Sequence, residues 1–265
     1  MGYISVGNNQ LHYQIWGAGK RLALAFHGYG NDAGMFFPIQ EYTSADFTML
    51  SFDLPHHGGS HWTNDTPLTL QQLTDLTKQL IQQYGVAKIS LLGYSLGGRI
   101  CLTIATSMPQ CIDKIVLLAT DGLTINGYYL FLTRTWLGRA VFRHLLTYPG
   151  PYFAIADMLE RAKLLHPSRN AFVKKALRTP EKRTMLLQVW PCLSGLLPSP
   201  RQIKHTIAQY KIQVCIFMGA QDKIMPPGIA RRFIYGLDSA SLIILEKGHK
   251  IFDNETAQPI AAQLI

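Results

Sequence analysis

The sequence lacks the long hydrophobic run and the signal-like start of membrane-inserted or exported proteins. No apolar stretch in its 265 residues approaches the roughly 20 residues of a membrane span, and Met1–Ser5 has neither a basic nor an apolar region. Cysteine is scarce: the four residues have no metal-site spacing, and Cys101 and Cys215 lie in apolar runs. We therefore expect a cytoplasmic protein without a membrane span, whose cysteines are reduced and belong to the core.

Acidic residues are few in one internal block. Asp121–Pro200 holds 11 Lys and Arg against 4 Asp and Glu, whereas the rest of the chain holds 14 against 12. There is no nucleic-acid-binding motif and no dense Lys/Arg run with interleaved aromatics, so no nucleic acid partner is expected. The basic block is either a solvated face or a surface that recognises anions.

Short apolar runs alternate with segments of helical periodicity along most of the chain. This alternation predicts an α/β fold with a mostly parallel sheet covered by helices on both faces. A hairpin of Ile4–Val6 and Leu11–Trp16 around Asn8–Asn9 precedes the expected strands Leu22–Phe26, Thr48–Asp53, Lys88–Leu92, Ile115–Ala119, Val214–Met218 and Leu242–Leu245. The expected helices are Leu70–Tyr84, Leu96–Met108, Ile229–Tyr235 and Glu255–Ile265.

Residues 122–200 break this rhythm because they carry no strand signal. Their helix candidates, separated by prolines, are Tyr129–Leu146, Pro151–Leu165, Arg169–Leu177 and Glu181–Leu193. The helical stretch coincides with the basic block. The sequence thus predicts a core of residues 1–121 and 201–265 with a helical insertion at 122–200.

The most informative motif is Gly93-Tyr94-Ser95-Leu96-Gly97, between an expected strand and an expected helix. This G-x-S-x-G pattern is typical of a tight turn that exposes a nucleophilic serine, because glycine removes the Cβ atoms that would collide there. The turn aims Ser95 at the helix N-terminus, where the Leu96 N–H can stabilise an oxyanion.

A nucleophilic serine needs a histidine base, and the histidine needs an acid that fixes its tautomer. His249 follows the last expected strand, and Asp222 follows the strand before it. Asp121, directly after Ile115–Ala119, is the competing candidate for the acid.

With the order Ser95, Asp222, His249, the chain resembles the α/β-hydrolase family over essentially its whole length. His27-Gly28-Tyr29-Gly30 resembles that family's oxyanion loop, which implies that the Tyr29 N–H is the second oxyanion donor. Asp53–Ser60 is similar to the family's D-x-P-G-x-G-x-S turn, but His56 stands where glycine is usual, which puts the local backbone in question. The resemblance also implies that the helical insertion is the family's cap.

The expected function is a serine-dependent hydrolase of an ester, thioester or related acyl bond of a small molecule. No cofactor is implied, and no metal is expected because His56, His57 and His61 lack a suitably spaced carboxylate or cysteine. Two alternatives stay open: a non-catalytic receptor on this fold, and a lyase. The stretch Tyr94–Arg99 resembles the SHCHC synthases of menaquinone biosynthesis, in which the arginine binds a substrate carboxylate. The oligomeric state stays open.

Three arginines of the insertion form the last candidate feature. Arg134, Arg139 and Arg143 recur on the expected helix Tyr129–Leu146 at spacings of five and four. On one continuous helix, Arg134 and Arg143 would lie about 180° apart, so the three are not expected to face one cleft. We expect Arg134, with help from Arg99, to meet an anionic group of the substrate.

Overall fold

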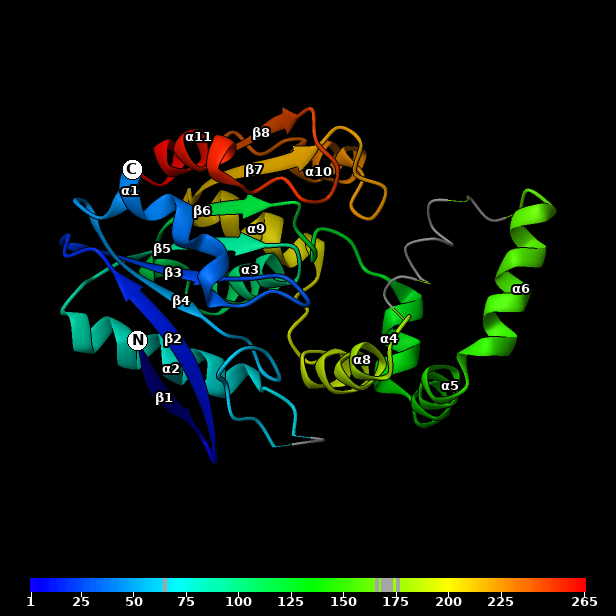
Figure 1. Ribbon diagram of the computed structural model, residues 1–265. Coiled ribbons are helices and arrows are strands. Elements are labelled where there is room, and N and C mark those ends of the chain that lie inside the picture. The colour runs from blue at the N-terminus through cyan, green and yellow to red at the C-terminus, as the bar shows by residue number, and fades with distance from the viewer. Residues whose placement is uncertain (64–65, 165–166, 168–173, 175–176) are drawn as a thin grey trace. The chain divides into compact units, whose positions relative to one another are not determined.

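The computed structural model describes residues 1–63, 66–164, 167, 174 and 177–265. Its contacts group the chain into two units, which Figure 1 shows. The core unit comprises Met1–Thr63, Leu68–Ile125 and Leu196–Ile265, and the helical unit comprises Asn64–Pro67 and Asn126–Gly195. Within the described ranges, no helix is long and apolar enough to cross a membrane.

The core unit is built on one eight-stranded sheet in the order β1-β2-β4-β3-β5-β6-β7-β8. β2 runs antiparallel to β1 and β4, and all other neighbouring strands are parallel. The mostly parallel sheet is therefore confirmed. The strands are β1 Gly2–Val6, β2 Asn9–Trp16, β3 Arg21–Phe26, β4 Phe47–Phe52, β5 Ile89–Tyr94, β6 Ile112–Leu118, β7 Gln213–Gly219 and β8 Ala240–Leu245.

Helices cover both faces of this sheet, as expected (Figure 1). On one face, η1 (Ala33–Ile39), α1 (Gln40–Thr43) and α11 (Asn254–Leu264) pack together. They share a core with alternate strand residues, among them Ala23, Leu92 and Phe217. The second layer consists of α2 Leu70–Tyr84, α3 Leu96–Ser107, α9 Pro200–Tyr210 and α10 Pro227–Ile234, which contact one another in that order.

Two local details differ from the sequence-based expectations. The first hairpin turns at Gly7–Asn8 rather than Asn8–Asn9, because Val6 pairs with Asn9 and Gly7 supplies the positive φ of 61°. The helix α9 was not anticipated, although its start carries a recognisable signal. The Ser199 side chain accepts from the Gln202 N–H and Pro200 occupies the first turn.

The helical unit contains α4 Gly127–Arg134, α5 Trp136–Thr147, α6 Pro149–Arg161 and α8 Pro180–Cys192. The expectation of one helix over Tyr129–Leu146 is wrong. Thr135 is extended, with φ −98° and ψ 151°, and its side chain accepts from the Gly138 N–H to cap a new helix. The candidate helix Arg169–Leu177 lies, apart from Lys174 and Leu177, outside the described residues.

Candidate active site

Ser95 occupies a strained turn between β5 and α3. Its φ of 49° and ψ of −113° fall in a region that non-glycine residues rarely adopt. Two backbone hydrogen bonds hold the turn: the Ser95 N–H donates to the Leu118 carbonyl at 2.8 Å, and the Asp121 N–H donates to the Ser95 carbonyl at 2.9 Å. The Ser95 side chain therefore stands, partly exposed, at the start of α3.

The turn also depends on close backbone approach at Gly97. A Cβ atom there would lie 1.8 Å from the Phe26 carbonyl oxygen. Gly97→Ala is therefore expected to lower the free energy of unfolding by about 3 kcal/mol or more, measured by urea unfolding. Gly228→Ala is the matched control, because a Cβ atom there meets no described atom within 4 Å beyond its chain neighbours and its own helix backbone. Equal effects of the two substitutions would contradict the steric argument.

His249 lies between Ser95 and Asp222. Its Nε2 is 3.1 Å from the Ser95 hydroxyl oxygen, and its Nδ1 is 2.7 Å from Asp222 Oδ2. The Asp222 side chain is fully buried, and its other oxygen accepts from the Ile224 and Met225 N–H groups at 2.8 and 2.9 Å. This arrangement can move a proton from the serine to the histidine while the carboxylate orients the ring.

Asp121, the competing acid, makes a different set of contacts. Its carboxylate forms an ion pair with the guanidinium of Arg99 and accepts from the Gly122 N–H at 2.7 Å. Of the two candidate acids, only Asp222 is recorded at hydrogen-bond distance from His249. Arg99 is 5% exposed, and its predicted role in substrate binding stays a prediction.

Tyr94 contacts His249 and holds it in place. The sequence places Tyr94 in the motif but does not indicate this contact. The Tyr94 hydroxyl donates to the His249 carbonyl oxygen at 3.1 Å, and the centroids of the two rings are 5.5 Å apart. Burial, helped by the nearby charge of Asp222, raises the pKa of Tyr94 to about 12. Tyr94 therefore remains a neutral donor that fixes the histidine loop.

Two groups of backbone amides lie near Ser95. Leu96 is the first residue of α3, so its N–H has no acceptor within the helix. The loop His27–Gly30 follows β3 and lies against Ser95: a methyl group on Gly28 would come within 3.1 Å of the Ser95 Cβ. The structure thus brings the Tyr29 loop and the Leu96 amide to the same end of the sheet as Ser95.

Two buried histidines tie this loop to the turn after β4. The Leu54 N–H donates to His27 Nε2 at 3.0 Å, and the Gly30 N–H donates to His57 Nε2 at 3.1 Å. Both rings donate from Nδ1 to carbonyl oxygens, so both are neutral. Sequence analysis missed this role of His57, because the contact joins residues 27 positions apart.

The histidine pair predicts a loss of stability in acid. Burial lowers the pKa of both His27 and His57 to about 4 from the usual 6.5, with His57 also lowered by repulsion from His27. Between these values the unfolded chain binds more protons than the folded one, so acidification favours unfolding. The free energy of unfolding should fall as the pH drops from about 6.5 to about 4, by about 3 kcal/mol for each histidine.

Urea unfolding across this pH range measures the effect. His57→Gln removes one titrating ring, so the free energy of unfolding should fall less steeply with decreasing pH than in the wild type. A wild-type stability that is constant from pH 6.5 to 4.5 would contradict the prediction.

In the turn after β4, His56 adopts a conformation that is open to glycine. His56 has φ +63°, which is the left-handed conformation that glycine usually supplies. The Asp53 carboxylate accepts from the Gly59 N–H at 2.7 Å and meets His12 Nδ1 at 2.7 Å. In the part of the chain that the structure describes, no three His, Cys, Asp or Glu side chains form a metal-binding group.

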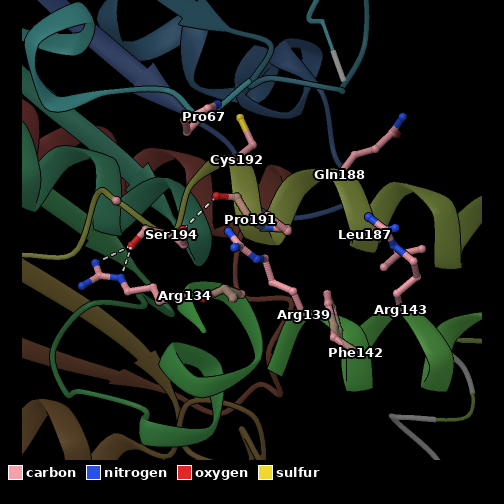
Figure 2. Close-up of a pocket in the computed structure, with 12 residues that line it drawn as sticks. Pro67, Arg134, Arg139, Phe142, Arg143, Leu187, Gln188, Pro191, Cys192 and Ser194 are labelled. Carbon is pink, nitrogen blue, oxygen red and sulfur yellow. Dashed lines mark hydrogen bonds between the residues drawn. The ribbon is translucent and has the colours of Figure 1, made fainter. Parts of the chain in front are cut away.

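The three arginines of the insertion occupy two helices, because the chain breaks at Thr135. Arg134 ends α4, while Arg139 and Arg143 lie on α5, and all three line one pocket of the helical unit (Figure 2). The premise of one continuous helix is therefore wrong, and the expectation that the three do not face the cleft together stays a prediction. Arg134 donates from Nε to the Ser194 carbonyl at 3.1 Å.

Comparison with known proteins identifies the family. The profile of the alpha/beta hydrolase fold family matches residues 24–256. The chain belongs to this family. It is 24% identical over 257 residues to the dihydrolipoyllysine-residue acetyltransferase component of the acetoin cleaving system of Pseudomonas putida, covering 96% of this chain and 65% of the relative. It is 34% identical over 110 residues to a pimeloyl-[acyl-carrier protein] methyl ester esterase of Xylella fastidiosa, covering 42% and 40%.

Among solved structures, this α/β hydrolase is similar to the enol-lactonase from Burkholderia xenovorans LB400. The TM-score is 0.64 at 22% identity, with 98% of this chain and 97% of that chain covered. The matches to the two sequence relatives span less than two thirds of their length: 65% of the acetyltransferase component and 40% of the methyl ester esterase. The expected family and fold class are confirmed, and so is the expectation of an α/β-hydrolase enzyme at the level of the family.

Proposed function

We propose that this protein is a serine hydrolase that cleaves an ester, thioester or related acyl bond of a small molecule. The contact chain from Ser95 through His249 to Asp222, at 3.1 and 2.7 Å, carries the proposal. The names of two similar proteins, a methyl ester esterase and an enol-lactonase, support ester chemistry. No step needs a metal or an organic cofactor.

The arrangement of Ser95, His249 and Asp222 supports the following reaction. Ser95 Oγ attacks the acyl carbon while His249 takes the hydroxyl proton at Nε2. The Leu96 and Tyr29 N–H groups hold the oxyanion that forms on the acyl oxygen. The tetrahedral intermediate collapses, and His249 returns the proton to the leaving alcohol or thiol. Water, deprotonated by His249, then attacks the acyl-enzyme, and His249 returns this proton to Ser95 Oγ as the acid is released.

The ion pair between Arg99 and Asp121 favours the hydrolase over the lyase alternative. The lyase hypothesis rests on an arginine that binds a substrate carboxylate, and the guanidinium of Arg99 already meets a carboxylate of the protein. The assembled serine, histidine and aspartate support an enzyme rather than a non-catalytic receptor.

A fluorophosphonate probe followed by mass spectrometry tests the proposal. We expect a covalent adduct on Ser95 and turnover of p-nitrophenyl esters or of acyl thioesters. Pairs of neutral and anionic acyl groups of equal length test the expected preference for an anionic substrate. An unlabelled Ser95 together with no turnover across the ester and thioester panel would overturn the proposal.

A further inference from the structure

The helical unit contains a pocket of about 570 Å³ with cationic and apolar walls (Figure 2). Its cationic wall comes from Arg134, Arg139 and Arg143. The rest of the lining is supplied by Pro67, Thr133, Phe142, Leu187, Gln188, Pro191, Cys192, Ser194 and Gly195. All of these residues belong to the helical unit, so the pocket is complete within it.

The break at Thr135 allows the three arginines to line one pocket. α4 ends at Arg134 and α5 starts at Trp136, so Thr135 alone separates two distinct helices. They approach closely at Gly138, where a Cβ atom would lie 1.9 Å from the Phe131 carbonyl oxygen. Arg139 and Arg143 are one helical turn apart, and Figure 2 shows both side chains extending from α5 toward α8.

In the described part of the chain, no acidic side chain pairs with an arginine of this wall. No Asp or Glu lines the pocket among the described residues. Within the same described part of the chain, Arg139 and Arg143 make no side-chain hydrogen bond or ion pair, and Arg134 donates to a carbonyl rather than a carboxylate. Residues 126–195 carry 11 Lys and Arg against 3 Asp and Glu, and the carboxylate of Asp157 already pairs with Lys174.

Part of the remaining wall is apolar. Phe142 is 3% exposed, and its ring stacks on Trp190 with centroids 5.4 Å apart and an interplanar angle of 13°. Leu187 and Pro191 of α8 continue this surface. A ligand that fits both walls has an anionic group joined to an apolar body.

We propose that this pocket binds the phosphoryl group of a small organic phosphate. Three guanidinium groups favour a phosphate monoester, whose charge at pH 7 is about −1.5 to −2, over a monocarboxylate. Arginine is also the side chain whose planar fork matches phosphate oxygens in pairs. Arg139 and Arg143 border a second hollow as well, but only the first pocket adds Arg134 and the α8 wall.

This binding site does not rest on the proposed hydrolase activity, because its readout is binding rather than turnover. The test is calorimetric titration of the whole chain with phenyl phosphate, in phosphate-free buffer at low and high salt. Benzoate and benzyl alcohol serve as the monocarboxylate and neutral probes of similar size. We expect phenyl phosphate to bind most tightly, and its affinity to fall with salt because the contacts are exposed charges.

Single substitutions locate the site. Arg139→Gln and Arg143→Gln should each raise the Kd for phenyl phosphate about 10-fold, because each removes a charge-assisted hydrogen bond. Both residues are exposed, so both variants should keep the wild-type circular dichroism and Tm. Arg232→Gln, an equal charge change on α10 of the core unit, is the matched control and should leave the Kd unchanged.

Three results would overturn the proposal. The first is phenyl phosphate binding no more tightly than benzyl alcohol, and the second is an equal Kd for Arg139→Gln, Arg143→Gln and Arg232→Gln. The third is tighter binding of benzoate than of phenyl phosphate, which would assign the pocket to carboxylates. Should a pocket variant unfold, Arg143→Lys is the substitute, because it keeps the positive charge but loses the planar guanidinium. An unchanged Kd for phenyl phosphate in Arg143→Lys would contradict recognition of paired phosphate oxygens by arginine.

Discussion

Replacing Ser95 by alanine should lower kcat on an ester substrate about 10³-fold or more, while the protein stays folded. The substitution removes only the hydroxyl that attacks the acyl carbon. No hydrogen bond of this hydroxyl other than the one to His249 is recorded among the described residues, so the packing around the turn should survive. The strained φ of 49° is kept by the backbone bonds to Leu118 and Asp121 rather than by the side chain.

The measurement pairs steady-state kinetics with circular dichroism and thermal unfolding. Ser107→Ala, at the other end of α3, is the matched control and should retain wild-type kcat, since its hydroxyl donates to the Thr103 carbonyl of the same helix. A well-folded Ser95→Ala protein that kept about a third of the activity would exclude Ser95 as the nucleophile.

Much of the core unit could be predicted from sequence because its signals are local. A short apolar run followed by glycines marks the C-terminal end of a parallel strand, and α/β folds gather such ends at one edge of the sheet. Ser95, Asp222 and His249 each follow a strand in this way, so their proximity follows from the strand order. The residues that set the ends of α2 are also close in sequence. Thr69 and Gln72 form a capping box at its start, and Gly85 ends the helix.

The remaining features depend on contacts that sequence patterns do not carry. Helical periodicity continues through Thr135, and only its extended backbone and its bond to Gly138 show that one helix ends there. That single residue decides whether Arg134 and Arg143 can line one pocket. The role of His57 depends on a hydrogen bond from Gly30, which joins the loops after β3 and β4. In the sequence, His57 is one of three histidines in a turn.

Asp222→Asn should lower kcat about 10⁴-fold with little change in structure, by the effect known for this substitution in Ser-His-Asp enzymes. The geometry gives the physical reason. The Ile224 and Met225 N–H groups point at Asp222 Oδ1, so the asparagine amide should place its oxygen there and its NH₂ toward His249. His249 Nδ1 must then accept, which puts the ring proton on Nε2 facing Ser95. A ring protonated at Nε2 cannot take the serine proton.

Asp121→Asn separates this mechanism from the alternative that the acid follows β6. It removes the same charge from a carboxylate that pairs with Arg99 instead of His249, so kcat of the folded protein should fall only mildly. Thermal unfolding accompanies the kinetics, because Arg99 is buried and loses its ion pair in this variant. If Asp121→Asn abolishes turnover and Asp222→Asn spares it, Asp121 is the acid and the His249–Asp222 contact is structural.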